Sequence, residues 1–318
     1  MSSGKRFLIS IDGGGSKTGI CVYDCENRTR FCDVCGGGNY KVHGIETVKE
    51  RISECLERMI PDAENVPEET RFLVLGLSGC DSPRDEEIYA EMITSLGFDR
   101  DNILICNDSE MIFRSLADAP GICVIAGTGT IALSFERDGG VQRAGGWGAP
   151  LSDEGSGYWI GAEMLRRYLS WVDGTGPFNE IFAGLDGAYP DNSAEEIAAE
   201  IGSLSPDQVA DWAITVFDGV SENSLCETIV RAAGHKAAEL AVSVYRKSGF
   251  SEEQDLTIVE SGSLFKNDLY ETSFREALKS LLPDNNYAFI RSDGIPAEDG
   301  IRLAEKMAAG PVITQSCD

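Results

Sequence analysis

Apolar residues along this chain alternate between short continuous runs and longer stretches with helical spacing. The runs "RFLIS" at 6–10 and "GICVYD" at 19–24 flank a glycine-rich turn and predict the two strands of a hairpin. Residues 44–60 carry apolar side chains every three or four positions, which predicts a helix with one apolar face. "FLVLGL" at 72–77 predicts a buried strand, and a polar helix follows near 84–96. "ILIC" at 103–106 is another short apolar run at the end of a strand, before "NDSEMIFRSLAD". This alternation is typical of an α/β fold.

The layout of the first hairpin recurs later in the chain. "ICVIAGTGTIALSFERDGG" at 122–140 matches "FLISIDGGGSKTGICVYD" at 7–24 as apolar strand, glycine turn with hydroxyls, strand and polar end. Aligned without gaps, the two segments place Gly13 opposite Gly127, Gly15 opposite Gly129, and Ser16 opposite Thr130, whereas Asp12 is matched by Ala126. The two loops are therefore alike but not equivalent.

Helical patterns dominate after residue 155, and the longest runs from about 222 to 248. "DLTIVESGSLF" at 255–265 then predicts a strand that ends in a third glycine turn, at Gly262 and Ser263, and 296–310 predicts a closing helix. Since no Pro/Ser-rich linker divides the chain, we expect two closely associated domains, 1–116 and 117–318.

The charge balance argues against a nucleic-acid partner. The 318 residues include 27 basic and 53 acidic side chains, a net charge of −26 that repels a phosphate backbone. The chain shows neither a signal-peptide pattern nor an apolar stretch long enough to span a membrane, so we expect a cytoplasmic protein without a membrane partner. Its oligomeric state stays open between monomer and homodimer.

Ten cysteines without a secretion signal favour free thiols over a disulfide framework. Cys32-x-x-Cys35 has a metal-like spacing, but no second such pair follows, and His43 and His235 are the only histidines in the sequence. A metal or cluster site is therefore not favoured. Scarce histidine also makes a carboxylate the more plausible general base.

The opening loop "SIDGGGSKTG" is neither of the two familiar phosphate loops. Ser16 stands where a Walker loop needs glycine before its Lys-Ser/Thr pair, and Thr18 replaces the last glycine of a dinucleotide fingerprint. One such hairpin alone would be explained by the need for positive φ in a turn. Two hairpins with backbone N–H groups and hydroxyls favour a grip on the phosphates of one nucleotide, with Asp12 holding Mg²⁺ through water. The alternative is a duplicated scaffold that binds no ligand.

In chain order, "IDGGGSKT", "GLSG", "ND", "AGTGT", "GGWGAPLSDEGSGYWIG" and "VESGSLF" resemble the motifs of the BadF/BadG/BcrA/BcrD-type ATPase family. Within it they are most similar to N-acetylglucosamine kinases. The resemblance spans nearly the whole chain and implies the fold shared by actin, sugar kinases and heat-shock chaperones. In that fold two ribonuclease-H-like domains close over ATP in the cleft between them.

The resemblance also implies roles for individual residues. ATP and Mg²⁺ are the expected cofactors and a small amino sugar the expected partner, phosphorylated on a hydroxyl that we expect to be C6. Asp108, after the "ILIC" run, would be the catalytic base and touch the sugar, and Asp12 would place the metal. The implied nucleotide contacts are Gly13, Gly14, Gly15, Ser16, Lys17 and Thr18 in the first loop, Gly127, Thr128, Gly129 and Thr130 in the second, and Gly262 and Ser263 in the adenosine turn. The implied sugar contacts are Asn39, Asp108, Trp147, Gly148 and Asp153.

Several of these residues have a purely structural alternative. Asp108 and its neighbours could cap the following helix, and Asn39 could occupy a left-handed turn. Trp147 could belong to the core, Asp153 could cap a helix that starts near Gly155, and Lys17 could be a solvated surface residue.

Two other functions also fit the family. One is an ATP-driven activator that passes electrons from an iron-sulfur cluster to a partner enzyme, which the ten cysteines keep open. The other is an ATP-driven switch without a sugar acceptor.

Overall fold

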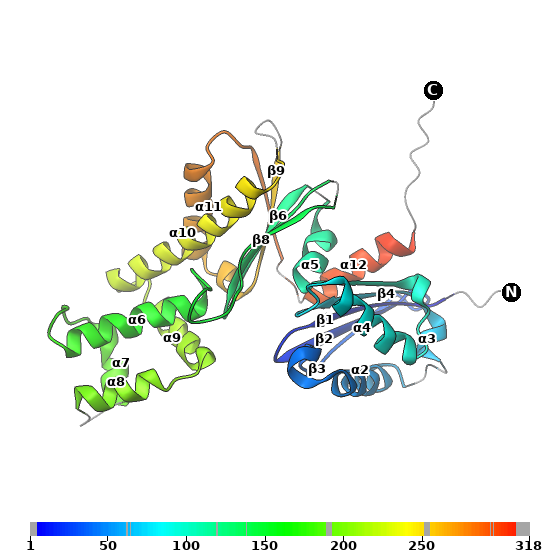
Figure 1. Ribbon diagram of the computed structural model, residues 1–318, viewed down its shortest axis with the longest axis horizontal. Helices are drawn as coiled ribbons and strands as arrows, with labels where there is room; N and C mark the ends of the chain where they lie inside the picture. The colour runs from blue at the N-terminus through cyan, green and yellow to red at the C-terminus, as the bar shows by residue number, and fades with distance from the viewer. Residues whose placement is uncertain are drawn as a thin grey trace. The chain divides into compact units, whose positions relative to one another are not determined.

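The computed structural model describes residues 5–309 except 62, 64, 119, 138, 189–192, 251–254, 293 and 295. It divides into two compact units (Figure 1). The first contains the chain up to Asp118 together with the segment from Ser292 onward, and the second runs from residue 119 to Arg291. The chain first passes from one unit to the other between residues 118 and 119, two residues after the boundary expected between 116 and 117. The expected assignment of the closing segment to the second domain is wrong.

The closing helix belongs to the first unit because its apolar face packs there. Helix α12 (Pro296–Ala308) buries Leu303 and Ala304 against Leu8 of β1 and Val74 of β4. The chain therefore crosses twice between the units, and no sequence pattern at residue 292 marks the second crossing.

The first unit is built on a five-stranded sheet in the order β3-β2-β1-β4-β5. Strands β1, β2 and β3 form an antiparallel meander, and β4 and β5 continue the sheet parallel to β1. The strands span Phe7–Gly13 (β1), Lys17–Asp24 (β2), Thr29–Gly36 (β3), Thr70–Leu77 (β4) and Ile103–Cys106 (β5).

Helices cover both faces of this sheet. The helices α2 (Ile45–Met59) and α4 (Pro83–Ser95) bury Ile52 and Ile93 against Ile9 and Leu75 on one face. On the other face α5 (Asp108–Leu116) and α12 bury Met111 and Leu303. Short helices α1 (Tyr40–His43), α3 (Val66–Glu69) and η1 (Arg100–Asn102) connect these elements.

The second unit repeats the same sheet topology. Its order, β8-β7-β6-β9-β10, again joins three antiparallel strands to two parallel ones. The strands span Gly121–Ala126 (β6), Thr130–Phe135 (β7), Val141–Gly145 (β8), Leu256–Ser261 (β9) and Tyr287–Arg291 (β10). The duplication predicted from the two hairpins therefore extends to whole sheets.

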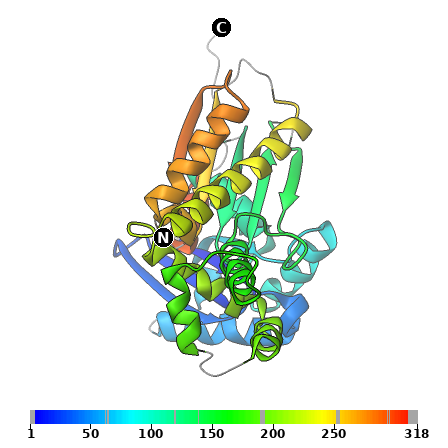
Figure 2. The same ribbon diagram turned by 90° about the vertical axis from the view of Figure 1, so that its left-hand side faces the viewer.

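Helices α10 (Ser224–Lys247) and α11 (Asp268–Leu281) lie side by side along this sheet (Figures 1 and 2). Their alanines, including Ala233, Ala237 and Ala241, are buried and allow close helix packing. The remaining helices are α6 (Gly157–Val172), η2 (Glu180–Phe182), α7 (Ala183–Ala188), α8 (Ala194–Gly202), α9 (Pro206–Asp218) and η3 (Ser263–Lys266). Among the described helices, none has the length and apolar content that a bilayer crossing requires.

Candidate functional site

The first glycine loop closes the β1–β2 hairpin. The ladder pairs Gly13 with Thr18, and within the loop the Gly14 N–H donates to the carbonyl oxygen of Lys17 at 2.8 Å. Ser16 and Lys17 are exposed. A Cβ atom placed on Gly15 would meet nothing within 4 Å, so the backbone on that side of the loop is open to a ligand.

The second loop closes the β6–β7 hairpin with one residue fewer. The ladder pairs Ala126 with Thr130, so three residues (127–129) form this loop whereas four (14–17) form the first. The hydroxyl residue in the position of Thr130 is therefore Thr18, and the gapless alignment that paired Thr130 with Ser16 is wrong. A Cβ atom on Gly127 would also meet nothing within 4 Å.

Two backbone N–H groups at the start of α6 donate hydrogen bonds to the second loop. Gly157 N–H donates to the Gly127 carbonyl oxygen at 2.8 Å, and Tyr158 N–H donates to that of Thr128 at 3.1 Å. The Thr130 hydroxyl is buried and has no hydrogen-bond partner among the described residues. An unsatisfied buried hydroxyl is costly, so its place in this loop indicates that a bound group completes the site.

A second glycine run, Gly36–Gly38, packs directly on the first loop, and the sequence analysis missed this role. The Gly38 N–H donates to the Gly14 carbonyl oxygen at 2.9 Å, and the Thr18 hydroxyl donates to that of Gly36 at 2.9 Å. A Cβ atom on Gly37 would lie 2.2 Å from the Gly15 carbonyl oxygen. Three consecutive glycines before Asn39 were the available signal for this close backbone approach.

Two carboxylates lie near each other beside the first loop. Asp12 precedes Gly13 at the end of β1, and Asp108 begins α5 directly after β5. Burial and, to a smaller extent, the negative charge of Asp108 together raise the pKa of Asp12 to about 7, although Lys17 opposes both effects. Two carboxylates in mutual repulsion at strand ends form a favourable place for a divalent cation.

The capping of α5 is performed by Asn107 rather than by Asp108. The Asn107 side chain accepts the Ser109 N–H at 3.0 Å, as an N-cap residue does. Asp108 is the first helical residue, and its Oδ1 accepts from the same N–H at 2.8 Å and from the Ser109 hydroxyl at 3.3 Å. These contacts orient the Asp108 carboxylate without making it the cap.

Asn39 lies in the same unit, at the start of α1. Its φ is −79°, so the alternative of a left-handed turn is wrong, and its Oδ1 caps the helix by accepting the Lys41 N–H at 2.9 Å. A Cβ atom on Gly79 of the "GLSG" segment would lie 2.8 Å from the Asn39 amide nitrogen. The Asn39 side chain therefore packs against the turn that follows β4.

Asp153 ties the second loop to the "GGWG" segment. The Asp153 carboxylate is buried and accepts the backbone N–H groups of Thr130 and Gly148, and its burial raises its pKa. Its φ of 67° is left-handed, and Ser156, not Asp153, caps α6. The helix-cap alternative for Asp153 is therefore wrong.

Trp147 is exposed over 72% of its surface, so the alternative of a core residue is also wrong. Its ring lies under the guanidinium of Arg143, whose Cζ is 4.1 Å from the ring centroid. Cation–π contact of this kind holds an exposed ring in place. The indole therefore presents a flat apolar surface beside Gly148.

Gly262 brings the third glycine turn to the second loop. It follows β9, the parallel neighbour of β6, and has a φ of 101°. A Cβ atom there would lie 2.2 Å from the Ala126 carbonyl oxygen, directly before Gly127. Only glycine fits this position, and Ser263 then starts η3.

The structure thus gathers the predicted residues into two sets. Asp12, residues 13–18, Asn39 and Asp108 belong to the first unit, and residues 127–130, 147–153, Gly262 and Ser263 belong to the second. Two cavities, of about 320 Å³ between α2 and α3 and about 590 Å³ beside α6, are lined by none of these residues.

Both sets fit the groups that the sequence predicts. The open sides of Gly15 and Gly127 leave space beside the two loops for phosphate oxygens, and the orphan Thr130 hydroxyl adds a donor. Asp12 offers the hard oxygen ligand that Mg²⁺ requires.

Nine of the ten cysteines lie in the part of the chain that the structure describes. Cys21 and Cys32 form a disulfide, so the expectation of thiols is wrong for this pair, and the seven other described cysteines are not disulfide-bonded. The one possible metal-ligand group found in that part is Cys21, Cys32 and Glu298, and its two sulfurs are bonded to each other.

The sequence is similar to a known protein family and to two characterised sugar kinases. The sequence profile of the BadF/BadG/BcrA/BcrD ATPase family matches residues 9–291. An N-acetyl-D-glucosamine kinase of Dictyostelium discoideum is 28% identical over 271 residues, which cover 81% of this chain and 85% of that protein. An N-acetylmuramic acid/N-acetylglucosamine kinase of Clostridium acetobutylicum is 33% identical over 172 residues, 54% of this chain and 56% of that protein.

A solved structure from Chromobacterium violaceum, provisionally assigned as an N-acetylglucosamine kinase, has the same fold. It aligns with a TM-score of 0.69 at 22% identity and covers 95% of this chain and 99% of its own. The predicted α/β fold with two ribonuclease-H-like sheets is confirmed.

Proposed function

Since the chain belongs to the BadF/BadG/BcrA/BcrD ATPase family, whose members bind ATP, we propose that it is a Mg²⁺-dependent kinase that phosphorylates an amino sugar. The acceptor is N-acetylglucosamine, N-acetylmuramic acid or glucosamine, and the phosphorylated hydroxyl is at C6. The two relatives, described as kinases of N-acetylglucosamine and N-acetylmuramic acid, support this class of acceptor.

The observation that carries the proposal is the placement of Asp108. Its carboxylate lies close enough to Asp12 to influence the pKa of Asp12, and a separate residue, Asn107, caps the helix. Phosphoryl transfer requires positioned phosphates, charge neutralisation and a base that accepts the proton of the attacking hydroxyl. Asp108 is the base in this proposal.

The remaining residues position the reactants. Asp12 holds Mg²⁺ through water, and the ion would supply neutralisation of phosphate charge. Lys17 contributes a positive charge at the first loop. Residues 13–18 and 127–130 bind the phosphates through backbone N–H groups other than those of Gly14, Gly127 and Thr130, which already have acceptors in the protein. The turn at Gly262 and Ser263, which packs against Ala126 directly before the second loop, contacts the adenosine.

Four side chains, those of Asn39, Asp108, Trp147 and Asp153, are the sugar contacts in this proposal. Asn39 and Asp108 offer an amide and a carboxylate for sugar hydroxyls, and the exposed Trp147 ring offers a face to the C–H groups of a pyranose. Asp153 uses two acceptor positions to hold Thr130 and Gly148, which leaves its remaining lone pairs for a hydroxyl. Directional hydrogen bonds of this kind reject analogues that lack the hydroxyl.

The decisive experiment measures Mg²⁺-dependent ADP release with glucosamine, N-acetylglucosamine, N-acetylmuramic acid and glucose as acceptors. Strong stimulation by one amino sugar is expected, and ³¹P–¹H correlation spectra of the product would then identify the phosphorylated hydroxyl. Slow hydrolysis unaffected by any sugar would overturn the proposal and favour an ATP-driven switch. A brown protein with bound iron and sulfide after anaerobic purification would instead favour the activator.

A further inference from the structure

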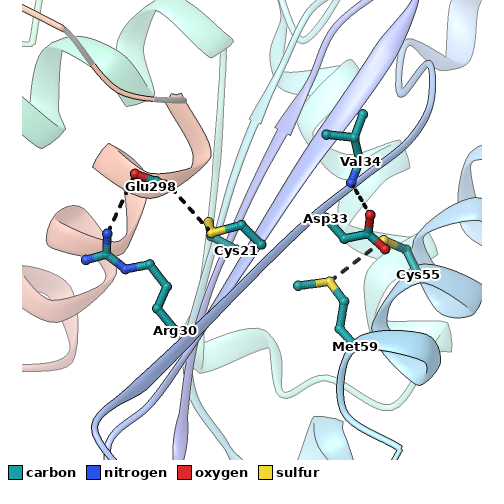
Figure 3. Close-up of a disulfide and its surroundings, with 8 residues drawn as sticks. Cys21, Arg30, Asp33, Val34, Cys55, Met59 and Glu298 are labelled. Atoms are coloured by element: carbon teal, nitrogen blue, oxygen red, sulfur yellow. Dashed lines mark hydrogen bonds and ion pairs between the residues drawn. A yellow bond between two sulfur atoms is a disulfide. The ribbon is translucent and has the colours of Figure 1, made fainter.

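The Cys32-x-x-Cys35 motif is split by the sheet. Neighbouring positions on β3 face opposite sides, so Cys32 and Cys35, three residues apart, cannot act together. Cys32 is bonded to Cys21 on the side of α12, where its Sγ lies 3.8 Å from Glu298. On the other side of β3 lie Asp33 and the α2 residue Cys55 (Figure 3).

Cys35 and Cys55 form a second pair of sulfurs on the α2 side. A hydrogen bond between the two side chains is the largest influence on the pKa of each, and Cys35 packs against the core cluster that contains Cys55. The Cys55 thiol also donates to Met59 Sδ at 3.8 Å. Cys35 is half-buried at the end of β3, whereas Cys55 is fully buried. Arg58 places one guanidinium nitrogen 3.5 Å from the Cys55 sulfur.

The surroundings of this pair favour a thiolate at Cys35. The pKa of Cys35 is lowered to about 7: the hydrogen bond with Cys55 lowers it most, burial opposes this effect, and Thr18, Arg51 and Arg58 lower it as well. Burial instead raises the pKa of Cys80 to about 12 and that of Cys226 to about 11. Because the thiolate is the reactive form, Cys35 is chemically distinct from these buried thiols.

We propose that Cys35 and Cys55 are a peroxide-oxidisable pair, in which Cys35 is attacked first and Cys55 resolves the product into a disulfide. In the first step the Cys35 sulfur attacks hydrogen peroxide, the O–O bond breaks, and a sulfenic acid and one water form. In the second step the Cys55 sulfur attacks that sulfenic acid, the S–O bond breaks, and a second water leaves. Hydrogen peroxide is the two-electron oxidant for the whole reaction.

The position of Cys35 couples this chemistry to the first glycine loop. Cys35 is the ladder partner of Thr18 and directly precedes the Gly36–Gly38 run that packs on the loop. The Arg51 guanidinium donates to the Gly37 carbonyl oxygen at 2.7 Å, and His43 Nε2 lies 2.7 Å from that of Gly15. A covalent bond to α2 draws the end of β3 toward the helix, so oxidation should loosen the contacts between the two glycine runs.

The first test uses the full-length protein, treated with hydrogen peroxide and digested under non-reducing conditions for mass spectrometry. A cross-link between the Cys35 and Cys55 peptides is expected. In Cys55→Ser a sulfenic acid should persist on Cys35 and react with dimedone, and Cys35→Ser should lose both products. Cys25→Ser, which removes a half-buried thiol whose pKa is raised by burial, is the matched control and should retain the cross-link.

Retention of both Cys35 and Cys55 as free thiols while other cysteines oxidise would overturn the proposal. The wild-type result needs no substitution, so a variant that misfolds does not weaken this test.

A second measurement follows the conformational effect without any ligand. Amide hydrogen exchange at residues 13–19 and 36–39 should become at least about tenfold faster on oxidation and return after dithiothreitol treatment. Unchanged exchange in a protein with the cross-link would overturn the coupling to the loop.

The consequence for nucleotide affinity rests on the proposed function, and we expect oxidation to raise the Kd for ATP about tenfold. If the reduced protein phosphorylates no sugar but the cross-link and the faster exchange appear, the proposed function fails while this inference stands.

Discussion

The carboxylates of Asp12 and Asp108 are close enough for the charge of Asp108 to add to the effect of burial, and the two together raise the pKa of Asp12 to about 7. The two residues come from different strand ends, 96 positions apart in the sequence. Neighbouring carboxylates in one site differ in role when their surroundings differ. Here Asp12 precedes the glycine loop and Asp108 starts a helix, so a metal-holding role for Asp12 and a base role for Asp108 are mutually consistent.

Substitution Asp108→Asn should lower kcat by roughly 10²- to 10⁴-fold, the usual contribution of a positioned base, and leave ATP affinity largely unchanged. The amide keeps the size of the side chain but cannot accept the proton of the sugar hydroxyl. Steady-state kinetics with the best acceptor and a separate ATP titration would measure both effects.

The matched control is Glu110→Gln, two residues away on α5. Glu110 pairs with Arg114 at 2.9 Å on the partly exposed surface of that helix, where such pairs contribute little. Near-normal turnover in Asp108→Asn, or an equal loss in Glu110→Gln, would contradict the role of Asp108.

Two alanine substitutions in the glycine runs should have different effects, one on ATP affinity and the other on the stability of the fold. Gly15→Ala adds a Cβ where nothing lies within 4 Å, so the melting temperature should stay unchanged. If phosphate occupies that space, the Kd for ATP should rise roughly tenfold, or about 1.4 kcal/mol. Gly37→Ala places its Cβ 2.2 Å from the Gly15 carbonyl oxygen and should destabilise the fold by about 1–3 kcal/mol.

Thermal melts and calorimetric ATP titrations of the two variants would check both expectations. Unchanged ATP affinity in Gly15→Ala would argue that this face of the loop does not meet the nucleotide. Full stability in Gly37→Ala would argue that the Gly15 carbonyl oxygen does not pack closely against Gly37.

The sequence predicted the buried elements well because burial leaves a pattern. The two hairpins, the apolar-faced helix α2, strands β4 and β9 and the long helix α10 all lie at the expected positions. It missed β3, β8 and β10, three of the four sheet edges, whereas the apolar run "ILIC" indicated the fourth edge, β5. An edge strand is partly solvated, so its residues do not alternate cleanly between apolar and polar types, as the mostly exposed "TRFCDVCG" of β3 shows.

Candidate site residues could be chosen one by one from the sequence, but their contacts could not. Local motifs pointed to Asp12, Asp108 and the three glycine turns as candidates, since each motif depends on its immediate neighbours. Asp153 accepts hydrogen bonds from the backbone N–H groups of Thr130 and Gly148, which lie on other segments of the chain. The disulfide forms because the pairing of β2 with β3 places Cys21 opposite Cys32. Such partners are determined by strand pairing, and local sequence spacing does not encode them.

Asp24 should make the stability of the protein depend on acid pH. The buried Asp24 carboxylate accepts from Arg6 at 2.6 Å and from the Asn27 amide at 2.7 Å, and the Arg6 contact holds its pKa well below the usual range. A lowered folded-state pKa stabilises the protein above the unfolded value of about 3.9, and this contribution is lost as the pH falls below that value. Asp24→Asn should therefore lower the unfolding free energy by about 1–3 kcal/mol at pH 7.

The difference between wild type and Asp24→Asn should persist from pH 7 to about 5 and shrink progressively below about pH 4. Urea unfolding at pH 7, 5, 4 and 3 would measure it. Glu26→Gln, which removes an exposed carboxylate 3.8 Å from Arg6, is the control and should change little. A difference that stays constant down to pH 3 would show that the charge of Asp24 is not its cause.

Asp153 should be needed for the stability of the second unit as well as for its site. Asp153→Ala leaves the N–H groups of Thr130 and Gly148 without their acceptor and forces alanine into a left-handed backbone, at a cost of about 2–5 kcal/mol together. Asp153→Asn keeps one acceptor oxygen and tolerates that backbone, so it should recover much of this loss. Urea unfolding curves for both variants, compared with Glu154→Ala as the exposed neighbour, would test the assignment. A loss below about 1 kcal/mol in Asp153→Ala would mean that solvent satisfies the two N–H groups and that the second loop does not depend on this carboxylate.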